Sequence, residues 1–233
     1  MVLIRSVLLA LLGASSALSN PVAELGSIDI EARRPVPNSE LLIRDSTPNS
    51  SGYKDGYYYS FWSDGLGSVN YTNGRGGSYA ITWSGPCSTI GGKGWNPGRA
   101  KKFHYSADYR TNGNSILEVY GWTTDPLVEY RIVENFGSYN PGSVAQIKGK
   151  HIADGSEYTV GNVTRYNQPS IQGTKTYQQI WSVRRNKRRN GTISLSDHFD
   201  AWKKFNLTLG RHNYQLFALE AYFSSGSVNV TLW

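Results

Sequence analysis

Two glutamates stand out because each occurs in an aromatic stretch with the pattern of a strand. Glu129 follows a proline within residues 126–135, where β-branched and aromatic residues alternate with charged ones. A period of two places Glu129 and Arg131 on one face of that strand. Glu220 lies in a second stretch of this kind, residues 214–222. A carboxylate on a concave strand face costs free energy unless it has a partner, so both side chains require an explanation.

Two glutamates on separate strands, each among aromatic residues, predict acid–base chemistry on a sugar. Glycosidases use a pair of Asp or Glu side chains that flank the bond to be cleaved. The 233-residue chain also contains 16 Tyr and 7 Trp, and their flat, hydrogen-bonding rings can stack on sugars. The alternatives stay open at this point, because a strand glutamate can be a surface carboxylate and an aromatic ring can simply pack a sheet.

The elements that would position these side chains are short strands joined by turns. Abundant Tyr, Trp and Thr with 25 Gly predict one twisted, antiparallel β domain. We predict strands at 56–62, 68–72, 78–83, 103–109, 115–122, 126–135, 158–166 and 177–183, and a last strand ending at 233. The glycine-rich residues 91–98 are predicted to be a tight connection. Residues 167–173, with Pro and Gly, are predicted to form a projecting hairpin tip.

One helix is predicted among these strands, from about Asp197 to Phe205 with Ser196 as its N-cap. Within it Phe199, Trp202 and Phe205 recur at a spacing of three. This spacing produces an apolar stripe that should dock on a sheet. The sequence shows no internal repeat and indicates no second domain.

The amino-terminal residues have the pattern of a secretory signal. Arg5 precedes an apolar run and then a run of small residues, so 1–19 is interpreted as a signal peptide. Residues 20–50 are interpreted as a pro-segment or flexible leader, and 51–233 as the folded domain. We therefore expect a secreted, extracellular glycoprotein. Six sequons are available for glycosylation, at Asn49, Asn70, Asn162, Asn190, Asn206 and Asn229, of which some must lie in strands.

The charge pattern bears on possible partners. The net charge is +7, and much of the excess lies in the basic residues 184–189. This run could bind nucleic acid, but no nucleic-acid motif accompanies it, and we favour a solvated strand end and turn. The single cysteine, Cys87, excludes an intrachain disulfide within this sequence. The four histidines are scattered along the chain without metal-ligand spacing, so no cofactor or metal is predicted.

At this point a family resemblance becomes clear. From about Gly52 to Trp233 the chain resembles the family 11 glycoside hydrolases, the compact endo-β-1,4-xylanases, and especially their secreted fungal members. The matching motifs include Tyr-Thr-Asn-Gly-Arg-Gly-Gly at 71–77, Tyr-Gly-Trp at 120–122, Pro-Leu-Val-Glu-Tyr at 126–130, Tyr-Asn-Gln-Pro-Ser-Ile at 166–171 and Glu-Ala-Tyr-Phe-Ser-Ser-Gly-Ser at 220–227. The resemblance implies a β-jelly roll of two curved antiparallel sheets with one helix and a long cleft. The hairpin at 169–171 would be a "thumb" over that cleft.

The resemblance also implies residue roles. Glu129 would be the nucleophile and Glu220 the general acid/base of a retaining mechanism on xylan. The residues expected to bind substrate are Trp62, Tyr120, Arg165, Pro169, Ile171, Gln179 and Tyr214. No cofactor is implied.

Three residues depart from the family pattern near this chemistry. Arg131 replaces a tyrosine on the cleft side of the nucleophile's strand, where its guanidinium would pair with Glu129 and weaken its attack. Ser88 replaces an Asn or Asp that bonds to the acid/base, and it is too short to reach Glu220 except through water. Ala221 replaces a glycine, and its methyl group could shift the strand of Glu220.

These departures leave two expectations for function. The first is a secreted endo-1,4-β-xylanase that acts on xylan or arabinoxylan as a monomer, with no nucleic-acid or membrane partner. The second is a catalytically impaired homologue that binds xylan, occupies a plant xylanase-inhibitor protein or is perceived by a plant host. A jelly-roll lectin is a poorer interpretation, because a lectin has no use for both glutamate motifs. From the sequence, replacing Arg131 with Tyr is expected to increase turnover.

Overall fold

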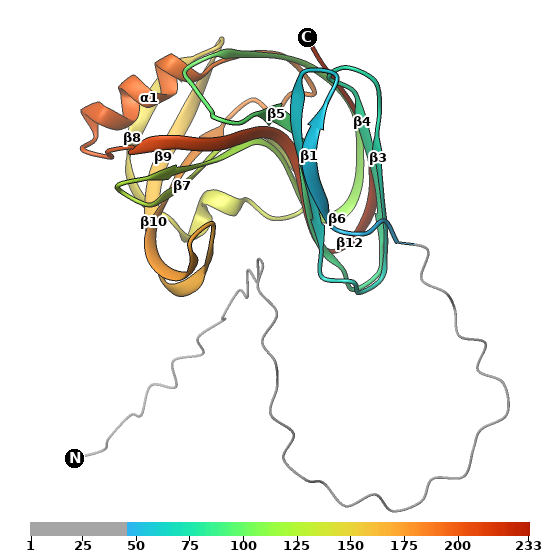
Figure 1. Cartoon of the computed structure of the whole chain (residues 1–233). Helices are drawn as coiled ribbons and strands as arrows, with labels where there is room; N and C mark the ends of the chain where they lie inside the picture. Colours follow the sequence, from blue (N-terminus) through green and yellow to red (C-terminus); the bar gives the residue numbers. More distant parts are fainter. Residues whose placement is uncertain (1–45) are drawn as a thin grey trace, which may run out of the picture.

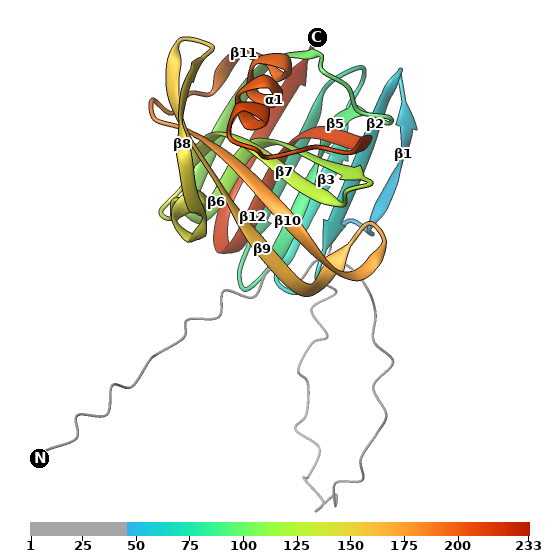
Figure 2. The same ribbon diagram turned by 90° about the vertical axis from the view of Figure 1, so that its left-hand side faces the viewer.

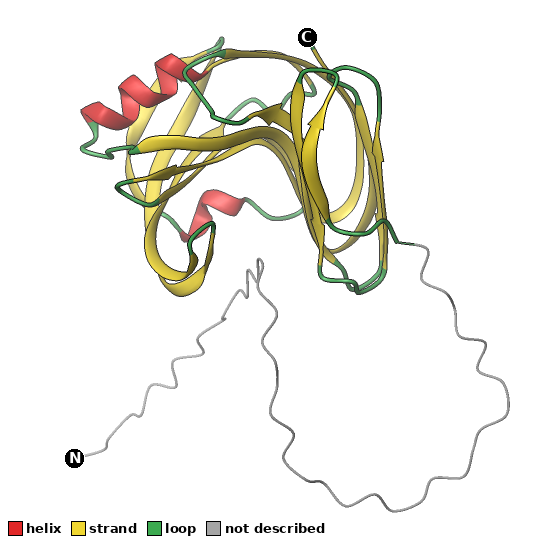
Figure 3. Cartoon of the chain, in the orientation of Figure 1, coloured by secondary structure: helices red, strands yellow, loops and turns green. Residues whose placement is uncertain are grey.

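The computed structural model describes residues 46–233, which form twelve strands, one α-helix and one short 3-10 helix (Figures 1 and 3). This confirms the predicted all-β fold with one α-helix for the described part of the chain. The strands are β1 (Ser50–Lys54), β2 (Tyr57–Ser63), β3 (Ser68–Asn73), β4 (Tyr79–Ser84), β5 (Ser88–Trp95), β6 (Lys102–Thr124), β7 (Val128–Phe136), β8 (Gln146–Ala153), β9 (Ser156–Ser170), β10 (Gly173–Arg184), β11 (Asn190–Ser194) and β12 (Arg211–Leu232). The helices are η1 (Pro141–Val144) and α1 (Leu195–Lys204).

Two long strands connect the two layers of the fold. β6 and β12 contain 23 and 22 residues, pair with each other along most of their length and bend together, as Figure 1 shows. One half of this pair lies in the layer ordered β1-β2-β5-β12-β6-β7-β10-β9-β8, and the other half pairs with β4 and β11. The two curved layers are therefore hydrogen-bonded into one twelve-stranded sheet that folds over as a jelly roll.

Side chains alternate between the core and the cleft along the strands. On β7, Val128, Tyr130 and Ile132 are buried in the core between the layers. Glu129 and Arg131 point to the other face, where they line a pocket. The predicted division of this strand into two faces is confirmed, and it explains how one strand serves both the core and the site.

The sheet departs from the expected antiparallel pattern at one place. β10 pairs with β7 in parallel, and this pairing sets Gln179 opposite Glu129. Between these two strands the chain passes through η1, β8 and β9, so that β10 runs in the same direction as β7. The parallel pairing places an amide side chain beside a glutamate that is fifty residues away in sequence.

The glycine-rich residues 91–98 were predicted to be a connection, and this prediction was wrong, because most of them form β5. A Cβ atom on Gly92 would lie only 2.1 Å from the carbonyl oxygen of Phe217, and one on Gly94 would lie 2.1 Å from that of Gln215. Both oxygens belong to β12. Glycine is therefore required here by close strand packing, which single-sequence turn rules do not anticipate.

The helix begins two residues earlier than predicted. Its N-cap is Ser194 rather than Ser196, and the Ser194 side chain makes no capping hydrogen bond. The backbone N–H of Ser194 instead donates to the carboxylate of Asp154, at 3.0 Å from Oδ2. The apolar stripe that includes Trp202 packs against the core as predicted. Figure 2 shows α1 in front of the sheet.

The hairpin of β9 and β10 is more regular than predicted. Strand pairing continues as far as Ser170 and Gly173, so only Ile171 and Gln172 form the turn. A shift in register between Lys175 and Tyr177 is the irregular point of the pair. This hairpin, orange in Figure 2, is the segment predicted to be the thumb.

The basic run at 184–189 was interpreted as a solvated turn, which is wrong for two of its arginines. Arg184 is buried and donates from Nη1 to the Tyr158 hydroxyl at 2.7 Å. Arg188 is half-buried and forms an ion pair with Glu134. The other basic side chains of the run are exposed. Part of the positive charge is thus used to satisfy buried oxygens inside the fold.

Residues just before β1 also contact the domain. The Ser46 hydroxyl accepts from the backbone of Val69 at 3.1 Å, and the Thr47 hydroxyl accepts from the backbone of Tyr71 at 2.9 Å. The predicted signal peptide and most of the predicted leader lie outside the described residues. No helix within residues 46–233 has the length and apolar character needed to cross a bilayer.

Candidate active site

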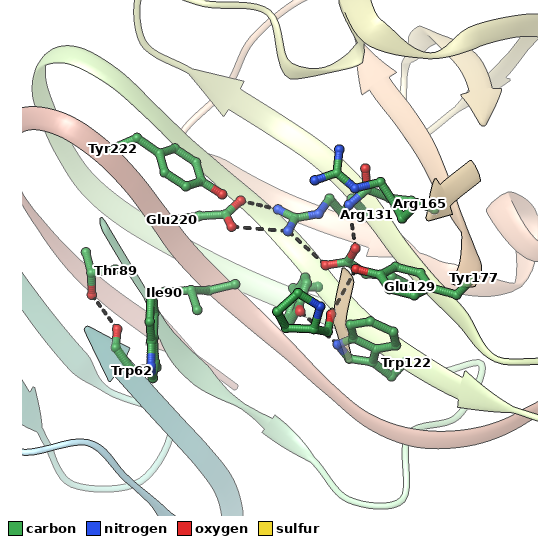
Figure 4. Close-up of a pocket in the computed structure, with 13 residues that line it drawn as sticks. Trp62, Thr89, Ile90, Trp122, Glu129, Arg131, Arg165, Tyr177, Glu220 and Tyr222 are labelled. Atoms are coloured by element: carbon green, nitrogen blue, oxygen red, sulfur yellow. Dashed lines mark hydrogen bonds and ion pairs between the residues drawn. The ribbon is translucent and has the colours of Figure 1, made fainter. Parts of the chain in front are cut away.

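A pocket on the concave face of the sheet brings the two glutamates together (Figure 4). Its lining comes from β2, β5, β6, β7, β9, β10 and β12, so the bent layer supplies nearly every side chain. The residues that line it are Trp62, Thr89, Ile90, Tyr120, Trp122, Glu129, Arg131, Arg165, Pro169, Tyr177, Gln179, Glu220 and Tyr222. The aromatic rings form walls around a charged centre.

Glu129 is held on both carboxylate oxygens. Its Oε1 accepts from Nη2 of Arg131 at 2.9 Å, and its Oε2 accepts from Nε2 of Gln179. The amide of Gln179 is oriented in turn, because its Oε1 accepts from Trp181 Nε1 at 3.0 Å. Glu129 therefore has a defined orientation at the pocket.

Glu220, on β12, is bound by the same arginine. Its Oε1 accepts from Nη2 of Arg131 at 3.1 Å, and its Oε2 accepts from Nη1. The hydroxyl of Tyr222 also forms a hydrogen bond with this carboxyl group. Figure 4 shows Arg131 between the two glutamates, so one guanidinium joins both candidate catalytic carboxyl groups.

Arg131 is enclosed by aromatic rings as well as by carboxylates. Its guanidinium carbon lies 4.8 Å from the ring centre of Tyr120 and 4.9 Å from that of Trp181. Burial alone would lower the pKa of Arg131, but the nearby carboxylates, led by Glu118, outweigh burial and raise its pKa. The arginine is thus a fixed cation. The expected contact between Arg131 and Glu129 is present, and the contact with Glu220 is an addition to that expectation.

A third carboxyl group, Glu118, was missed by the sequence interpretation. It lies on β6 with no exposed surface, and its Oε1 accepts from Nη1 of Arg131 at 2.7 Å. A signal was available, because period two from Tyr120 and Trp122 places Glu118 on the same face of its strand. The sequence pattern does not show what this side chain contacts, because its partner lies on another strand.

Five of the seven predicted substrate-binding residues line the pocket: Trp62, Tyr120, Arg165, Pro169 and Gln179. The other two lie beside it. Ile171 and Tyr214 pack on the aromatic cluster of the cleft face, where the Tyr214 ring centre is 6.1 Å from that of Tyr120. Neither of these two contributes directly to the pocket wall.

Ser88 and Ala221, the other two residues that depart from the family pattern, have little contact with the glutamates. Ser88 is buried and lies opposite Tyr222 in the sheet, and it does not line the pocket. The methyl group of Ala221 points into the core between the layers. Pairing of β12 with β5 and β6 continues without a shift through Ala221, so the alanine interrupts neither pairing.

Several pocket residues were absent from the predicted set. They are Thr89, Ile90, Trp122, Tyr177 and Tyr222. Burial raises the pKa of Tyr177 to about 12, and it raises the pKa of Tyr120 and of Tyr222 well above the ordinary value. These hydroxyls therefore stay protonated at ordinary pH and can donate hydrogen bonds. Within residues 46–233 no group of three or more His, Cys, Asp or Glu side chains could hold a metal ion.

A β-jelly roll whose concave face carries paired carboxyl groups between aromatic walls defines a glycoside hydrolase. Comparisons with known proteins agree with this assignment to the glycoside hydrolases. The chain belongs to the glycosyl hydrolases family 11, whose family model matches residues 54–231. The resemblance seen in the sequence is thereby confirmed.

Relatives of this chain include fungal xylanases. It is 54% identical over 224 residues to Endo-1,4-beta-xylanase 4 of Pyricularia oryzae, covering 95% of this chain and 96% of that protein. It is 52% identical over 193 residues to Ethylene-inducing xylanase 1 of Botryotinia fuckeliana, covering 83% and 69% respectively. A solved endo-1,4-β-xylanase structure from Trichoderma reesei matches with a TM-score of 0.72 and 35% identity, covering 80% of this chain and 99% of that one.

Proposed function

We propose that this protein is an endo-1,4-β-xylanase that hydrolyses internal β-1,4-xylosidic bonds of xylan or arabinoxylan with retention of configuration. One observation carries the mechanism. Nη2 of Arg131 contacts Oε1 of both Glu129 and Glu220, at 2.9 and 3.1 Å. These two oxygens are therefore at most about 6 Å apart, which is below the roughly 6.5–9.5 Å of inverting pairs and compatible with the roughly 5–5.5 Å of retaining pairs.

In the first step, the carboxylate of Glu129 attacks the anomeric carbon while Glu220 gives its proton to the glycosidic oxygen. The bond between that carbon and that oxygen breaks, and a xylosyl ester forms on Glu129. In the second step, Glu220, now a carboxylate, removes a proton from water. The water oxygen attacks the anomeric carbon and releases Glu129.

The surrounding side chains support these two roles. Gln179 donates to one oxygen of Glu129 and thereby fixes the orientation of the carboxylate. Trp62 presents a ring on which a xylose unit can stack, and Tyr120 lines the pocket beside Glu129. Arg165 and Pro169 come from the β9–β10 hairpin, so the thumb contributes directly to the pocket.

A second candidate function rests on Arg131. Its guanidinium contacts both glutamates, and a contacting cation favours the ionised form of a carboxyl group. If Glu220 could not hold its proton, the cleft would bind xylan without cleaving it. Such a protein could occupy a plant xylanase inhibitor or be perceived by a plant host. Among the relatives, those from Botryotinia fuckeliana and Verticillium longisporum are named ethylene-inducing xylanases.

The deciding experiment measures release of reducing ends from soluble arabinoxylan by the purified protein over a broad pH series. Glu129→Ala serves as the blank, and Glu220→Gln should lose most of the activity, about 10³-fold, while its circular dichroism stays unchanged. Release above the blank supports the xylanase. Release equal to the blank from folded protein supports the binding protein, and wild-type turnover by Glu220→Gln removes the acid/base assignment.

The proposal includes where the protein acts. Secretion directed by residues 1–19 would deliver a monomer to plant cell walls, and the leader would end near residue 50. Of the six sequons, Asn162 is the least accessible to a glycan, because its Nδ2 donates to Gln178 at 2.7 Å in a half-buried position. The other five asparagines are exposed. Mass spectrometry of the secreted protein, for its first residue and its glycan sites, tests these statements.

A further inference from the structure

A second pocket lies beside the candidate active site. Its volume is about 520 Å³, which is within the roughly 300–1,000 Å³ that ligand pockets occupy. The residues that line it come from the end of β7, from the segment that contains η1, and from β8, β9 and β10. These last three strands are neighbours in the sheet, as Figure 2 shows. The second pocket is thus formed by elements that also border the cleft.

Trp181 connects the two pockets. It lines the second pocket, and its indole donates to Gln179 and lies 4.9 Å from the guanidinium carbon of Arg131, two residues that line the first. Val183 follows on the same face of β10 and also lines the second pocket. From Gln179 to Val183 the strand advances about 13 Å. One polysaccharide chain bound at the glutamates can therefore reach the second pocket.

The walls of the second pocket have the character of a sugar site. Phe136 presents a half-buried ring and Ile147 an exposed apolar side chain. Asn140, Ser143 and Thr159 add an amide and two hydroxyl groups. A sugar ring offers apolar C–H faces and hydroxyl groups at its edge, so it matches walls of this mixed kind.

Two cations on these walls have donors to spare. The ammonium of Lys150 and the guanidinium of Arg185 both approach Oε1 of Glu157, at 2.9 and 3.8 Å. Their side chains are 59% and 73% exposed. One carboxylate oxygen uses few of the three donors of an ammonium and the five of a guanidinium. The pocket therefore presents a net positive charge with free hydrogen-bond donors.

The cations near the pocket differ in how far the fold already uses them. Arg184 also lines the pocket, but its guanidinium donates to the Tyr158 hydroxyl and to two backbone carbonyl groups, those of Asp154 and Asn186. Among the described residues that line the pocket, Glu157 is the one acidic side chain. Lys150 and Arg185 are therefore the cations that a bound anion would meet.

We infer that the second pocket binds a uronic acid carried as a side group on the xylan backbone, with Arg185 and Lys150 holding its carboxylate. This inference rests on the proposed function, because it extends that site from the neutral backbone to an acidic branch. A guanidinium binds a carboxylate through two parallel donors, and an ammonium adds a point charge. A neutral arabinose branch would gain nothing from either cation, so the pocket would favour acidic over neutral branches.

The test measures binding by the full chain with Glu129→Ala, which prevents turnover. The probes are glucuronoxylan fragments and the same fragments after reduction of their carboxyl groups to alcohols. The acidic fragments should bind about tenfold more tightly at low salt, and added salt should reduce this preference. Arg185→Gln and Lys150→Gln should each lower the preference by about threefold, and the two together should abolish it. Binding of the reduced fragments should stay unchanged.

Arg110→Gln is the matched control. Arg110 is an exposed arginine that pairs with Asp108 at 3.0 Å, and it lies on the part of β6 that belongs to the other layer. This variant should keep the full preference for acidic fragments. An equal loss in Arg110→Gln and Arg185→Gln would show a general effect of net charge and overturn the inference.

Three further outcomes would also overturn it. They are equal affinity for acidic and reduced fragments, a preference that persists when both cations are replaced, and equally good displacement of the fragments by polygalacturonate, which has no xylan backbone. The first comparison needs no substitution in the pocket, so it decides the matter even if a variant fails to fold.

Turnover separates this inference from the xylanase proposal. A protein that is inactive on arabinoxylan but prefers the acidic fragments would contradict the xylanase proposal and support the pocket. With an active protein, Arg185→Gln should raise KM for glucuronoxylan by about threefold and leave kcat/KM for the carboxyl-reduced polymer unchanged. An active enzyme that treats the acidic and reduced polymers alike would support the xylanase and overturn the pocket.

Discussion

Gln179 lies directly opposite Glu129 in the parallel pairing of β10 with β7, and its amide donates to Oε2 of that glutamate. The Trp181 indole holds the amide in place. We predict that Gln179→Glu lowers kcat/KM by about 100-fold, because a second carboxylate in contact with Glu129 forces the two to share a proton. The kcat/KM of both proteins for arabinoxylan hydrolysis, measured at several pH values, tests this prediction.

Gln178→Glu is the matched control for that change. Gln178 is the neighbouring residue on β10, and its amide contacts Asn162 and Thr164 rather than the pocket. Activity within about twofold of the unaltered protein is expected, since this charge would point away from the pocket and be partly screened. Equal losses in both variants would show that the interaction between Gln179 and Glu129 is unimportant.

Arg131→Tyr was expected from sequence to increase turnover, and Glu118 changes that expectation. Burial raises the pKa of Glu118 and Arg131 is the one group that lowers it, so in Arg131→Tyr the ionisation of Glu118 opposes folding. The stability of the single variant should therefore be near normal below about pH 4.3, the ordinary Glu value, and decrease as pH rises, by up to about 3 kcal/mol. Urea unfolding at pH 4 and pH 7 measures this difference.

The gain in turnover should instead appear when both charges are removed. In Glu118→Gln with Arg131→Tyr, neither a buried cation nor its counter-ion remains, and Glu129 and Glu220 are left as an ordinary carboxyl pair. We expect this double variant to be more stable than Arg131→Tyr at pH 7 and to exceed it in kcat. If Glu118→Gln with Arg131→Tyr is no more stable and has no higher kcat than Arg131→Tyr alone, the coupling between Glu118 and Arg131 is contradicted.

A pair of neighbouring histidines predicts how stability depends on pH. The His151 ring centre lies 4.7 Å from that of His198, and burial, followed by His198, lowers the pKa of His151 to about 4. The unfolded chain therefore binds the proton first, and stability decreases as pH falls from about 6.5 to about 4. After allowance for partial exposure, His151 should contribute about 1 kcal/mol to that loss.

His151→Gln tests this by unfolding measurements at pH 7 and pH 4. The stability difference between this variant and the unaltered protein should be about 1 kcal/mol smaller at pH 4 than at pH 7. If the stability difference between His151→Gln and the unaltered protein is larger at pH 4 than at pH 7, the predicted direction of the pH dependence is wrong.

The close packing of β5 gives a prediction about stability alone. A Cβ atom at position 92 would lie 2.1 Å from the Phe217 oxygen, a backbone atom that cannot rotate away. Gly92→Ala should therefore destabilise the fold by about 3 kcal/mol. Gly52→Ala in β1, whose Cβ would lie 3.4 Å from the Tyr59 ring, should change stability by less than about 0.5 kcal/mol. Thermal unfolding of both variants compares them.

Much of the site could be predicted because its residues lie on strands with clear alternation. The faces of β7 and the positions of Glu129, Arg131 and Glu220 follow from a period of two and from the family motifs. Trp62 and Gln179 were likewise assigned to the pocket that they line. For Trp62 and Gln179 the prediction rested on the family resemblance and not on the pattern of a single strand.

The remaining features depend on contacts between distant strands. Nothing local to Glu118 shows that Arg131 lies within 2.7 Å of it, because the contact is made across β6 and β7. The glycines of β5 are ambiguous for the same reason, since the constraint on Gly92 is the backbone of Phe217. The interpretation of the run at 184–189 failed because buried acceptors such as Tyr158 are 26 residues from Arg184.

The shared strands β6 and β12 have a consequence for the order in which the protein opens. Their backbone amides pair on both sides over much of the cleft layer and continue into the second layer. Opening either strand would break both layers at once, whereas the tip of the β9–β10 hairpin can separate alone. In native-state hydrogen exchange, the amides around Glu118 and Glu220 should belong to the most protected unit, and those near Ile171 to the least. The site would then remain assembled during local opening, while access to it is governed by the hairpin.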